Sequence, residues 1–440
     1  MGAQLPAGGR RVTTSHHAPT TKLSAPQLQA WLLQQAHDVG FDDAAVVRVD
    51  DGLAPRSNAL RALVDNGLQD ALPYMTTSVD DRADIRRRVP GAKSVLVVVQ
   101  NYFTQARPPA PSPHHMRVSR YAWGKDYHQV MKKKLVKLRK RLMAYAERFA
   151  DDLFDDDERP IVSAFNDASP VLERGWAEAG GLGSFGKSTM FIHRRFGTYT
   201  FLGGLVTNID VGGVAVVDGG DVCGSCTACL DACPTGAIVQ PFEVDAARCI
   251  STWTVERPLE DAPADVFVGH DWAMGCDVCQ EVCPHNKFAQ PTSEARFAPL
   301  PGHVWLDDDV PGDLAGTPLA RPGVDGLARN VERARQASTA GTRLVAWASL
   351  TEDDVHALAT VASTWATARW PALEDEQLKH ALRKALDSAP DSSDDAVVQH
   401  LAAVVDAHAV ALRLRRGRHA QPLTLQRRRQ WVQALLQTQT

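Results

Sequence analysis

All eight cysteines of this 440-residue chain lie in one window, between Cys223 and Cys283. The first four follow the spacing Cys-x2-Cys-x2-Cys-x3-Cys-Pro and occupy positions 223, 226, 229 and 233. Three thiolates at this spacing reach three corners of one [4Fe-4S] cube from a tight loop, and the fourth points toward a second cluster. This is the bacterial-type ferredoxin pattern. A zinc ribbon is the alternative, but it pairs two Cys-x2-Cys knuckles and needs no closing Cys-Pro.

The remaining four cysteines do not repeat the first run. Cys249 stands alone and is followed by Cys276-x2-Cys279-x3-Cys283-Pro284. If the runs exchange ligands as in two-cluster ferredoxins, the first cluster takes Cys223, Cys226, Cys229 and Cys283, and the second takes Cys233, Cys249, Cys276 and Cys279. Eight thiolates for two cubes leave no spare thiol to act as a nucleophile. The sequence therefore predicts an electron-transferring protein with two neighbouring clusters.

Composition narrows the class of protein further. The chain has 48 Lys+Arg against 52 Asp+Glu, a formal charge of −4, which argues against a generically basic nucleic-acid coat. It has no apolar stretch of about 18 residues or more, so no membrane span is expected. Residues 1–24 are polar and predict a disordered tail, and Arg10-Arg11 lacks the apolar region of an export signal. We expect a cytoplasmic monomer, in which thiols serve as metal ligands rather than disulfides.

Hydrophobic patterning predicts an α/β domain before the cysteines. Strands are expected at 44–49, 94–102, 161–165 and 199–206, and helices after Ser24, near 58–67, at 126–149 and at 170–180. After about 290 the chain is punctuated by Pro and Asp, and it becomes helical from about 323. The prediction is an α+β multidomain fold, with a tail (1–24), an α/β domain (25–215), a ferredoxin-like domain (216–290) and a helical region (291–440).

Two segments are basic enough to contact a polyanion. One face of the helix at 126–149 carries Lys132, Lys133, Lys134, Lys137, Arg139, Lys140 and Arg141. Residues 407–440 carry seven arginines and no acid. A charged helix face is usually a solvated surface, and the alternative is a contact surface for phosphates.

Outside the cysteines, several short segments in a fixed order resemble one enzyme family. They are Gly40-Phe41, PYM at 73–75, VPGAKSVLVVVQNY at 89–102, SRYAWGKDYH at 119–128, DASPVLER at 167–174, GLGSFGK at 181–187, FLG at 201–203, the cysteine segments at 223–238, 249–256 and 275–286, and TPLARPGVDGLARN at 317–330. Together they resemble the epoxyqueuosine reductases, which are cobalamin-dependent iron–sulfur enzymes of tRNA queuosine modification. The resemblance covers about residues 25–330.

The resemblance implies a fold similar to reductive dehalogenase cores, with an α/β cobalamin-binding domain, a two-cluster ferredoxin-like module and HEAT-like helices. It also implies a two-electron reduction of the epoxide of epoxyqueuosine, at the wobble position of tRNA, to queuosine and water. An external low-potential donor would pass electrons through the clusters and reduce cobalamin to the cob(I)alamin level. The Asp-x-His-x-x-Gly motif of a cobalt-ligating histidine is absent, because Met131 follows Asp126-Tyr127-His128 where Gly would be needed.

The same resemblance assigns roles to individual residues. An opening epoxide leaves an alkoxide, which a positioned acid should protonate. Asp167 matches the family's acid and would need burial to raise its pKa, although Asp before Ala-Ser-Pro is by itself more typical of a helix N-cap. Implied cofactor contacts are Ser119, Asp126, His128, Asp167, Lys187, Phe191, Leu202, Val255, Gly275 and Gln280. Implied tRNA contacts are Ser251 and Arg257.

The chain also departs from the family pattern. Thr77, Ser184 and Ser188 stand where Arg, Trp and His are common, and residues 331–440 match poorly. One alternative is therefore a related cobalamin and iron–sulfur reductase that acts on a small molecule, although the basic segments and the lack of an export signal argue against it. Another is an electron carrier without a catalytic site, for which the domain before the clusters is far larger than needed.

Overall fold

A computed structural model describes residues 19–49, 53–106, 115–155, 158–215, 219–257, 261–262, 271–306, 310 and 312–340. Within these ranges no helix is both long and apolar enough to cross a membrane. The predicted tail up to residue 18, the acidic residues 156–157 and everything after residue 340, including the arginine-rich segment, lie outside the described residues.

The centre of the molecule is a four-stranded sheet with the order β1-β2-β7-β4, built from β1 (Asp43–Arg48), β2 (Ser94–Asn101), β7 (Thr200–Thr207) and β4 (Val162–Phe165). All three pairings are antiparallel, and Val98 of β2 lies opposite Gly203 of β7. Strand β2 is buried at all eight positions, as its continuous apolar run predicts. The alternation of strands and helices along the chain is more typical of a parallel sheet, so strand order and direction could not be taken from it.

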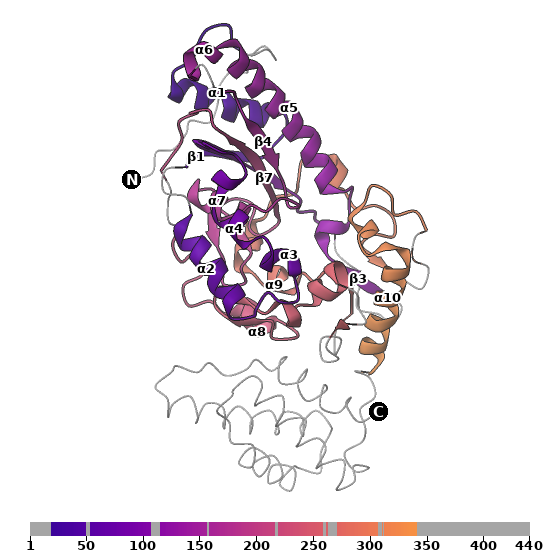
Figure 1. Cartoon of the computed structure of the whole chain (residues 1–440). Helices are drawn as coiled ribbons and strands as arrows, with labels where there is room; N and C mark the ends of the chain where they lie inside the picture. Colours follow the sequence, from indigo (N-terminus) through magenta and orange to yellow (C-terminus); the bar gives the residue numbers. More distant parts are fainter. Residues whose placement is uncertain are drawn as a thin grey trace, which may run out of the picture.

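Helices cover both faces of this sheet (Figure 1). On one face, α1 (Ala25–Asp38) and α5 (Tyr127–Arg148) pack against Leu96 and Val98. On the other face, Val95, Val97 and Val99 pack against α7 (Glu173–Ala179) and the segment that leads into α2 (Ala54–Asp65). Alternate residues of β2 thus serve two cores, which fixes its register.

Shorter elements complete this part of the chain. They are α3 (Pro73–Thr76), α4 (Val79–Ala83), a 3-10 turn at Ile85–Arg87, a 3-10 turn at Arg120–Ala122, α6 (Ala150–Leu153), and the hairpin of β5 (Gly183–Phe185) and β6 (Phe191–His193). The predicted helix near 58–67 begins earlier, at Ala54, and the PYM segment forms the short helix α3.

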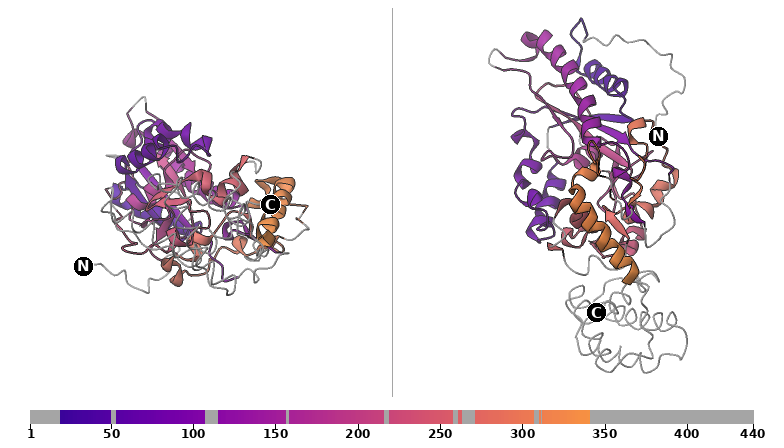
Figure 2. Two further views of the ribbon diagram at one scale, coloured as in Figure 1. Left: turned by 90° about the horizontal axis from the view of Figure 1, so that it is seen from below. Right: turned by 90° about the vertical axis from the view of Figure 1, so that its right-hand side faces the viewer.

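A second sheet joins three distant parts of the chain. Its order is β10-β3-β11, from β10 (Trp272–Met274), β3 (Met116–Val118) and β11 (Trp305–Leu306). Helix α10 (Gly323–Ala340) packs beside it along one side of the molecule (Figures 1 and 2). Because β3 precedes the cysteines, β10 lies among them and β11 follows them, the sheet ties the cysteine region to both of its neighbours.

The cysteine region itself consists of short elements. These are α8 (Ala228–Ala232), the hairpin of β8 (Ile238–Gln240) and β9 (Glu243–Val244), a 3-10 turn at Ala246–Arg248, a π-helical turn at Thr252–Glu256, α9 (Val278–Glu281) and a 3-10 turn at Pro284–Phe288; further 3-10 turns follow this region at Ala295–Phe297 and Pro318–Ala320. With so little regular structure, this region depends on its tertiary contacts and on whatever its cysteines bind.

One predicted surface residue is buried. Lys134 of α5 donates from Nζ to the carbonyl oxygen of Gly40 at 2.7 Å and to Gln100 Oε1 at 2.5 Å, and it pairs with Glu294 at 2.8 Å. The prediction of an exposed basic face was therefore wrong for Lys134, because its partners come from other segments. The exposed lysines of this face are Lys132, Lys133, Lys137 and Lys140.

Candidate active site

Asp167 lies in the loop after β4, where it contacts the first turn of α5. Its Oδ2 accepts a short hydrogen bond from Tyr127 Oη and lies 2.9 Å from His128 Nε2. Its backbone φ is +48°, a left-handed conformation that Asp tolerates better than most residues. Asp167 is not the N-cap of α7, a position that Leu172 occupies. The local reading of Asp167 as a helix cap is therefore wrong.

His128 lies between two carboxylates. Its Nδ1 is 2.8 Å from Asp126 Oδ1, and its Nε2 faces Asp167. Asp126 also caps α5 by accepting the backbone N–H of His128 at 2.9 Å. Burial by itself would lower the pKa of His128, but its hydrogen bonds to Asp167 and Asp126 outweigh burial and raise it. When protonated, the imidazole can donate from both nitrogens, one to each carboxylate.

Asp167 and Glu173, which contacts the backbone of Asp167, have pKa values shifted in opposite directions. For Asp167, burial favours a raised pKa, but the hydrogen bonds from His128 and Tyr127 outweigh it, so the pKa lies below its ordinary value. Glu173, the first residue of α7, accepts the backbone N–H of Asp167 at 2.5 Å. Burial, helped by the charge of Asp167, raises the pKa of Glu173 to about 8. Two neighbouring carboxyl groups whose pKa values are pushed apart are typical of acid–base sites.

Aromatic rings hold the tyrosine of this site in place. The ring of Tyr127 stacks on Phe201 of β7, with centroids 4.1 Å apart and planes 5° apart, and on His128 at 4.0 Å. Gly203 follows Phe201 by two residues, and a Cβ there would stand 2.8 Å from the carbonyl oxygen of Phe165. The glycine of the FLG segment therefore lets the end of β4, and with it the Asp167 loop, approach β7.

The thiols fall into two groups, according to which of them raise one another's pKa. Burial raises the pKa of Cys229 to about 11, and the thiols that contribute to the rise include Cys223, Cys283 and Cys226. Burial likewise raises the pKa of Cys276 well above its ordinary value, with contributions from Cys279, Cys249 and Cys233. We call Cys223, Cys226, Cys229 and Cys283 the outer group, and Cys233, Cys249, Cys276 and Cys279 the inner group. This grouping coincides with the predicted exchange of ligands.

No set of three or more His, Cys, Asp or Glu side chains in the described ranges is close enough to hold one metal ion. The charge of Cys229 in the outer group also contributes to the raised pKa of Cys279 in the inner group. The two groups are therefore neighbours.

The inner group adjoins a buried polar atom without a partner. Gly275 precedes Cys276 and has a φ of +65°, and a Cβ on it would lie 2.1 Å from Ser119 Oγ. Ser119 is almost fully buried, and its Oγ has no hydrogen-bond partner. The ring of Tyr121 lies beside Gly275 and, on its other side, 6.2 Å from the ring of Tyr127. A short path of side chains thus leads from the inner group to the Asp167 site.

Other predicted contacts lie around this path or away from it. Gln280 is buried in α9 and bonds to Asp277 and Tyr102, and Val255 packs with the core beside the second sheet. Lys187 donates from Nζ to the carbonyl oxygens of Gly224 and Cys226, so it supports the outer cysteine loop. Two further residues, Phe191 and Leu202, are buried in the core on the α7 face.

The two predicted tRNA contacts have partners within the chain. Ser251 hydrogen-bonds to Cys249, and Arg257 lies 3.4 Å from Asp261. Ser251 therefore lies beside the inner cysteine group, whereas Arg257 is half-buried at the end of the π-helical turn.

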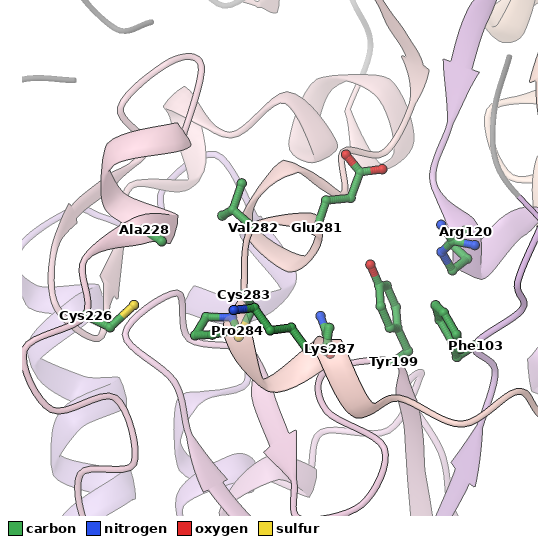
Figure 3. A pocket seen from close by; sticks show the side chains of 11 residues that line it. Phe103, Arg120, Tyr199, Cys226, Ala228, Glu281, Val282, Cys283, Pro284 and Lys287 are labelled. Carbon is green, nitrogen blue, oxygen red and sulfur yellow. The ribbon is translucent and has the colours of Figure 1, made fainter. Parts of the chain in front are cut away.

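A pocket of about 490 Å³ opens beside the outer cysteine group. Figure 3 shows Cys226, Cys283 and Pro284 on one side of it, Tyr199, Phe103 and Arg120 on the other, and Lys287 between them. The inner group has no cysteine among the residues that line this pocket.

Sequence reasoning missed three residues of the Asp167 site. Tyr127 and Glu173 lie inside the quoted segments at 119–128 and 167–174, but nothing in their spacing marks them as partners of Asp167. Arg321 comes from the segment at 317–330, pairs with Glu256 at 2.5 Å, and helps to lower the pKa of Asp167. Only the folded chain brings these positions together.

Comparisons with known proteins find one family of relatives. The family profile described as "Epoxyqueuosine reductase QueG, DUF1730" matches residues 82–154, and the profile "4Fe-4S double cluster binding domain" matches residues 222–286. Epoxyqueuosine reductase of Synechocystis sp. is 44% identical over 227 residues, which are 51% of this chain and 73% of that protein. The same enzyme of Leadbetterella byssophila is 36% identical over 316 residues, 69% of this chain and 96% of that one.

Among solved structures, an epoxyqueuosine reductase crystallised with an epoxyqueuosine-modified tRNA stem loop is similar in fold. Its TM-score is 0.59 at 21% sequence identity, over 94% of this chain and 100% of that chain. The sequence relatives and this fold lead to one conclusion. The chain belongs to the epoxyqueuosine reductase family.

Proposed function

We propose that this chain reduces epoxyqueuosine in tRNA to queuosine, with electrons that pass through two [4Fe-4S] clusters to cobalamin. The observation that carries the proposal is the Asp167–His128–Tyr127 site, which lies one short path of side chains from eight thiols grouped as four and four. Named relatives and the tRNA-bound structure of a similar fold support the substrate.

The residues fit both cofactors. The inner and outer cysteine groups supply the four thiolates that each cluster needs. Ser119 Oγ, buried and without a partner, is available to a polar group of cobalamin, and Gly275 leaves the backbone open beside it. When bound, cobalamin supplies the low-valent metal that delivers electrons to the epoxide. The further contacts proposed for it are Asp126, His128, Asp167, Lys187, Phe191, Leu202, Val255 and Gln280.

The reaction consumes two electrons and two protons and releases the epoxide oxygen as water. The structure offers two acids for these protons. Of this pair His128 holds the proton, because its pKa is raised while that of Asp167 is lowered. Asp167, 2.9 Å from His128 Nε2, can relay that proton to the oxygen as the C–O bond breaks. Glu173, whose pKa is raised to about 8, keeps a second proton beside the same loop near neutral pH. We therefore assign the acid role to the His128–Asp167 pair, with Glu173 as the proton reserve.

We also propose that the exposed lysines of α5 bind the tRNA. Lys132, Lys133, Lys137 and Lys140 are exposed on α5, the helix whose first turn carries Tyr127 and His128. Lysines along such a helix can neutralise backbone phosphates while the modified base enters the site. Ser251 and Arg257 are retained as proposed contacts. We expect the protein to act as a cytoplasmic monomer.

The test uses anaerobically reconstituted protein with cobalamin, a strong reductant, and tRNA that carries epoxyqueuosine. Nucleoside mass spectrometry should detect queuosine with the wild type, and Asp167→Asn should lower the yield by about 10²-fold or more because Asn cannot pass on the proton. Equal conversion by both proteins would keep the function and remove Asp167 from its role. No conversion by wild type with reduced clusters and bound cobalamin would favour a relative that reduces a small molecule.

A further inference from the structure

The loop after β4 has few attachments to the rest of the chain. Ala168 donates its N–H to the carbonyl oxygen of Asn166 at 2.6 Å, which closes one tight turn. A second turn is closed by Val171, whose N–H donates to the carbonyl oxygen of Ser169 at 2.8 Å. Pro170 has no N–H to donate. These local hydrogen bonds shape the loop, but they do not fix where it lies relative to α5 and α7.

Asp167 supplies the contacts that fix this loop in place. Its carboxylate contacts Tyr127 and His128 at the start of α5. Its backbone N–H donates to Glu173 Oε1 at the start of α7 at 2.5 Å. Among the described residues, residues 166–170 make one further hydrogen bond to another element, from Asn166 Nδ2 to the carbonyl oxygen of His128 at 3.4 Å. The loop is therefore held mainly by one residue, between two helices that cover opposite faces of the sheet (Figure 1).

The backbone of Asp167 depends on the contact with Glu173. A φ of +48° is unfavourable for a residue with a side chain, and such a conformation persists where the surrounding contacts impose it. Side chains of a helix lean toward its N-terminus, so the first residue of α7 can reach back to the loop that precedes the helix. Glu173 thus accepts the N–H of the strained residue, while the carboxylate of that residue faces α5.

The charged groups that face Glu173 do not replace this contact. The charge of Asp167 repels a carboxylate at Glu173, whereas Arg174 beside it and Arg82 of α4 attract one. Tyr127 of α5 also faces Glu173. Both arginines donate elsewhere, Arg174 to a backbone carbonyl oxygen and Arg82 to a serine hydroxyl, and neither forms an ion pair with Glu173 among the described residues. The hydrogen bond from the N–H of Asp167 is therefore the specific contact of this carboxyl group.

We propose that Glu173 is a positioning residue, which holds the carboxylate of Asp167 against His128 by accepting the backbone N–H of Asp167. The proposal deepens the proposed function and rests on it for the role of Asp167. Positioning requires an acceptor of the right reach, and it does not require a proton that can be given away. Gln has a side-chain oxygen at the same distance from the backbone and can replace Glu. Asp is one methylene shorter, so its carboxylate cannot occupy the same place.

The test measures the pKa of His128 in the full-length protein with reconstituted clusters, without cobalamin or tRNA. NMR titration of ring-labelled histidines gives this pKa, and His128→Gln identifies the signal. Asp167 and Asp126 both raise it, and Asp126 is unchanged in every variant. We expect Glu173→Asp to lower the pKa of His128 by about one unit, because Asp167 moves away. Glu173→Gln should leave it as in the wild type. Both variants should fold, since Asp is favourable in the first turn of a helix and Gln keeps the hydrogen bond.

The matched control is Asp210→Ala, which removes a carboxylate that accepts the backbone N–H of Gly212 at 2.9 Å in the loop after β7. It should leave the pKa of His128 unchanged. An unchanged pKa in Glu173→Asp would overturn the proposal. An equal fall in Glu173→Gln would also overturn it, because the charge of Glu173 rather than its reach would then matter. So would an equal fall in the control. The expected pattern in a protein that fails to convert epoxyqueuosine would refute the proposed function and leave the positioning role standing.

Discussion

The Asp167 site and the cysteine groups are assembled in opposite ways. The cysteine groups come mainly from two short loops, at 223–233 and 276–283, whose spacing already brings the thiols together. The Asp167 site draws its side chains from the start of α5, the loop after β4, the start of α7 and the segment before α10. Electron handling is thus encoded locally, whereas proton handling exists only after the sheet and its helices have formed.

The largest effect is expected from a break in the inner cysteine group. Cys279→Ala removes a proposed ligand of the inner cluster, the one we place next to the Asp167 site, so it should abolish turnover with any reductant. Cys226→Ala removes a ligand of the outer cluster, and a small reductant can still reach the inner one. Some dithionite-driven turnover should therefore survive. Iron analysis and queuosine formation check both variants, and equal activities would show that the groups are not arranged as an outer and an inner step.

In the Asp167 site, His128→Gln should lower turnover by up to about 10²-fold, while the rate of cluster reduction stays the same. Gln still donates to Asp167 but carries no transferable proton. Because the pKa of His128 is raised by its two carboxylate partners, wild-type turnover should fall as pH rises through that raised pKa. The variant should lose this part of the pH profile. A variant that keeps the wild-type profile would assign the titration to another group.

Glu173→Gln should have a smaller effect on turnover and a clear effect on stability. The folded-state pKa of Glu173 is about 8, above its ordinary 4.5. Between these values the unfolded chain loses a proton that the folded chain keeps. The free energy of unfolding therefore falls as pH rises from 4.5 toward 8. Gln can still accept the N–H of Asp167, so the variant should be more stable than wild type at pH 8, by at least about 1 kcal/mol, and similar at pH 4.5.

Thermal unfolding of both proteins at pH 5 and pH 8 checks this expectation. A wild-type midpoint that is as insensitive to pH as that of Glu173→Gln would show that the carboxyl ionises normally. Glu178→Gln is a poor control, because Glu178 pairs with Arg56. Glu147→Gln, on the exposed side of α5, changes the same chemical group away from the Asp167 site.

The contrast between the two sites also explains what the sequence could predict. The double-cluster domain was predictable because Cys-x2-Cys-x2-Cys-x3-Cys-Pro fixes a loop, whereas the assignment of each cysteine to a cluster stays a prediction. The four strands were predictable because they are apolar runs. The antiparallel order was not, since the alternation of strands and helices along the chain is more typical of a parallel sheet. The burial of Lys134 was not predictable from its position among other lysines, because its partners Gly40, Gln100 and Glu294 come from distant segments. Glu173 carried no signal, because its role depends on a backbone N–H in a loop with positive φ.

The smallest predicted effect concerns tRNA binding, and it distinguishes the lysines of α5 from Lys287 at the outer cysteine group. Lys132→Gln with Lys137→Gln should weaken tRNA binding several-fold and lower the slope of log affinity against log salt by about 1 to 2, since each lysine would neutralise one phosphate. Lys287→Glu, at the outer cysteine group, should leave tRNA binding as it is. Filter binding over a series of salt concentrations measures both. If Lys287→Glu weakened tRNA binding as much as the α5 variant, the tRNA would also cover the outer cysteine group, and the lysines of α5 would not be a distinct contact surface.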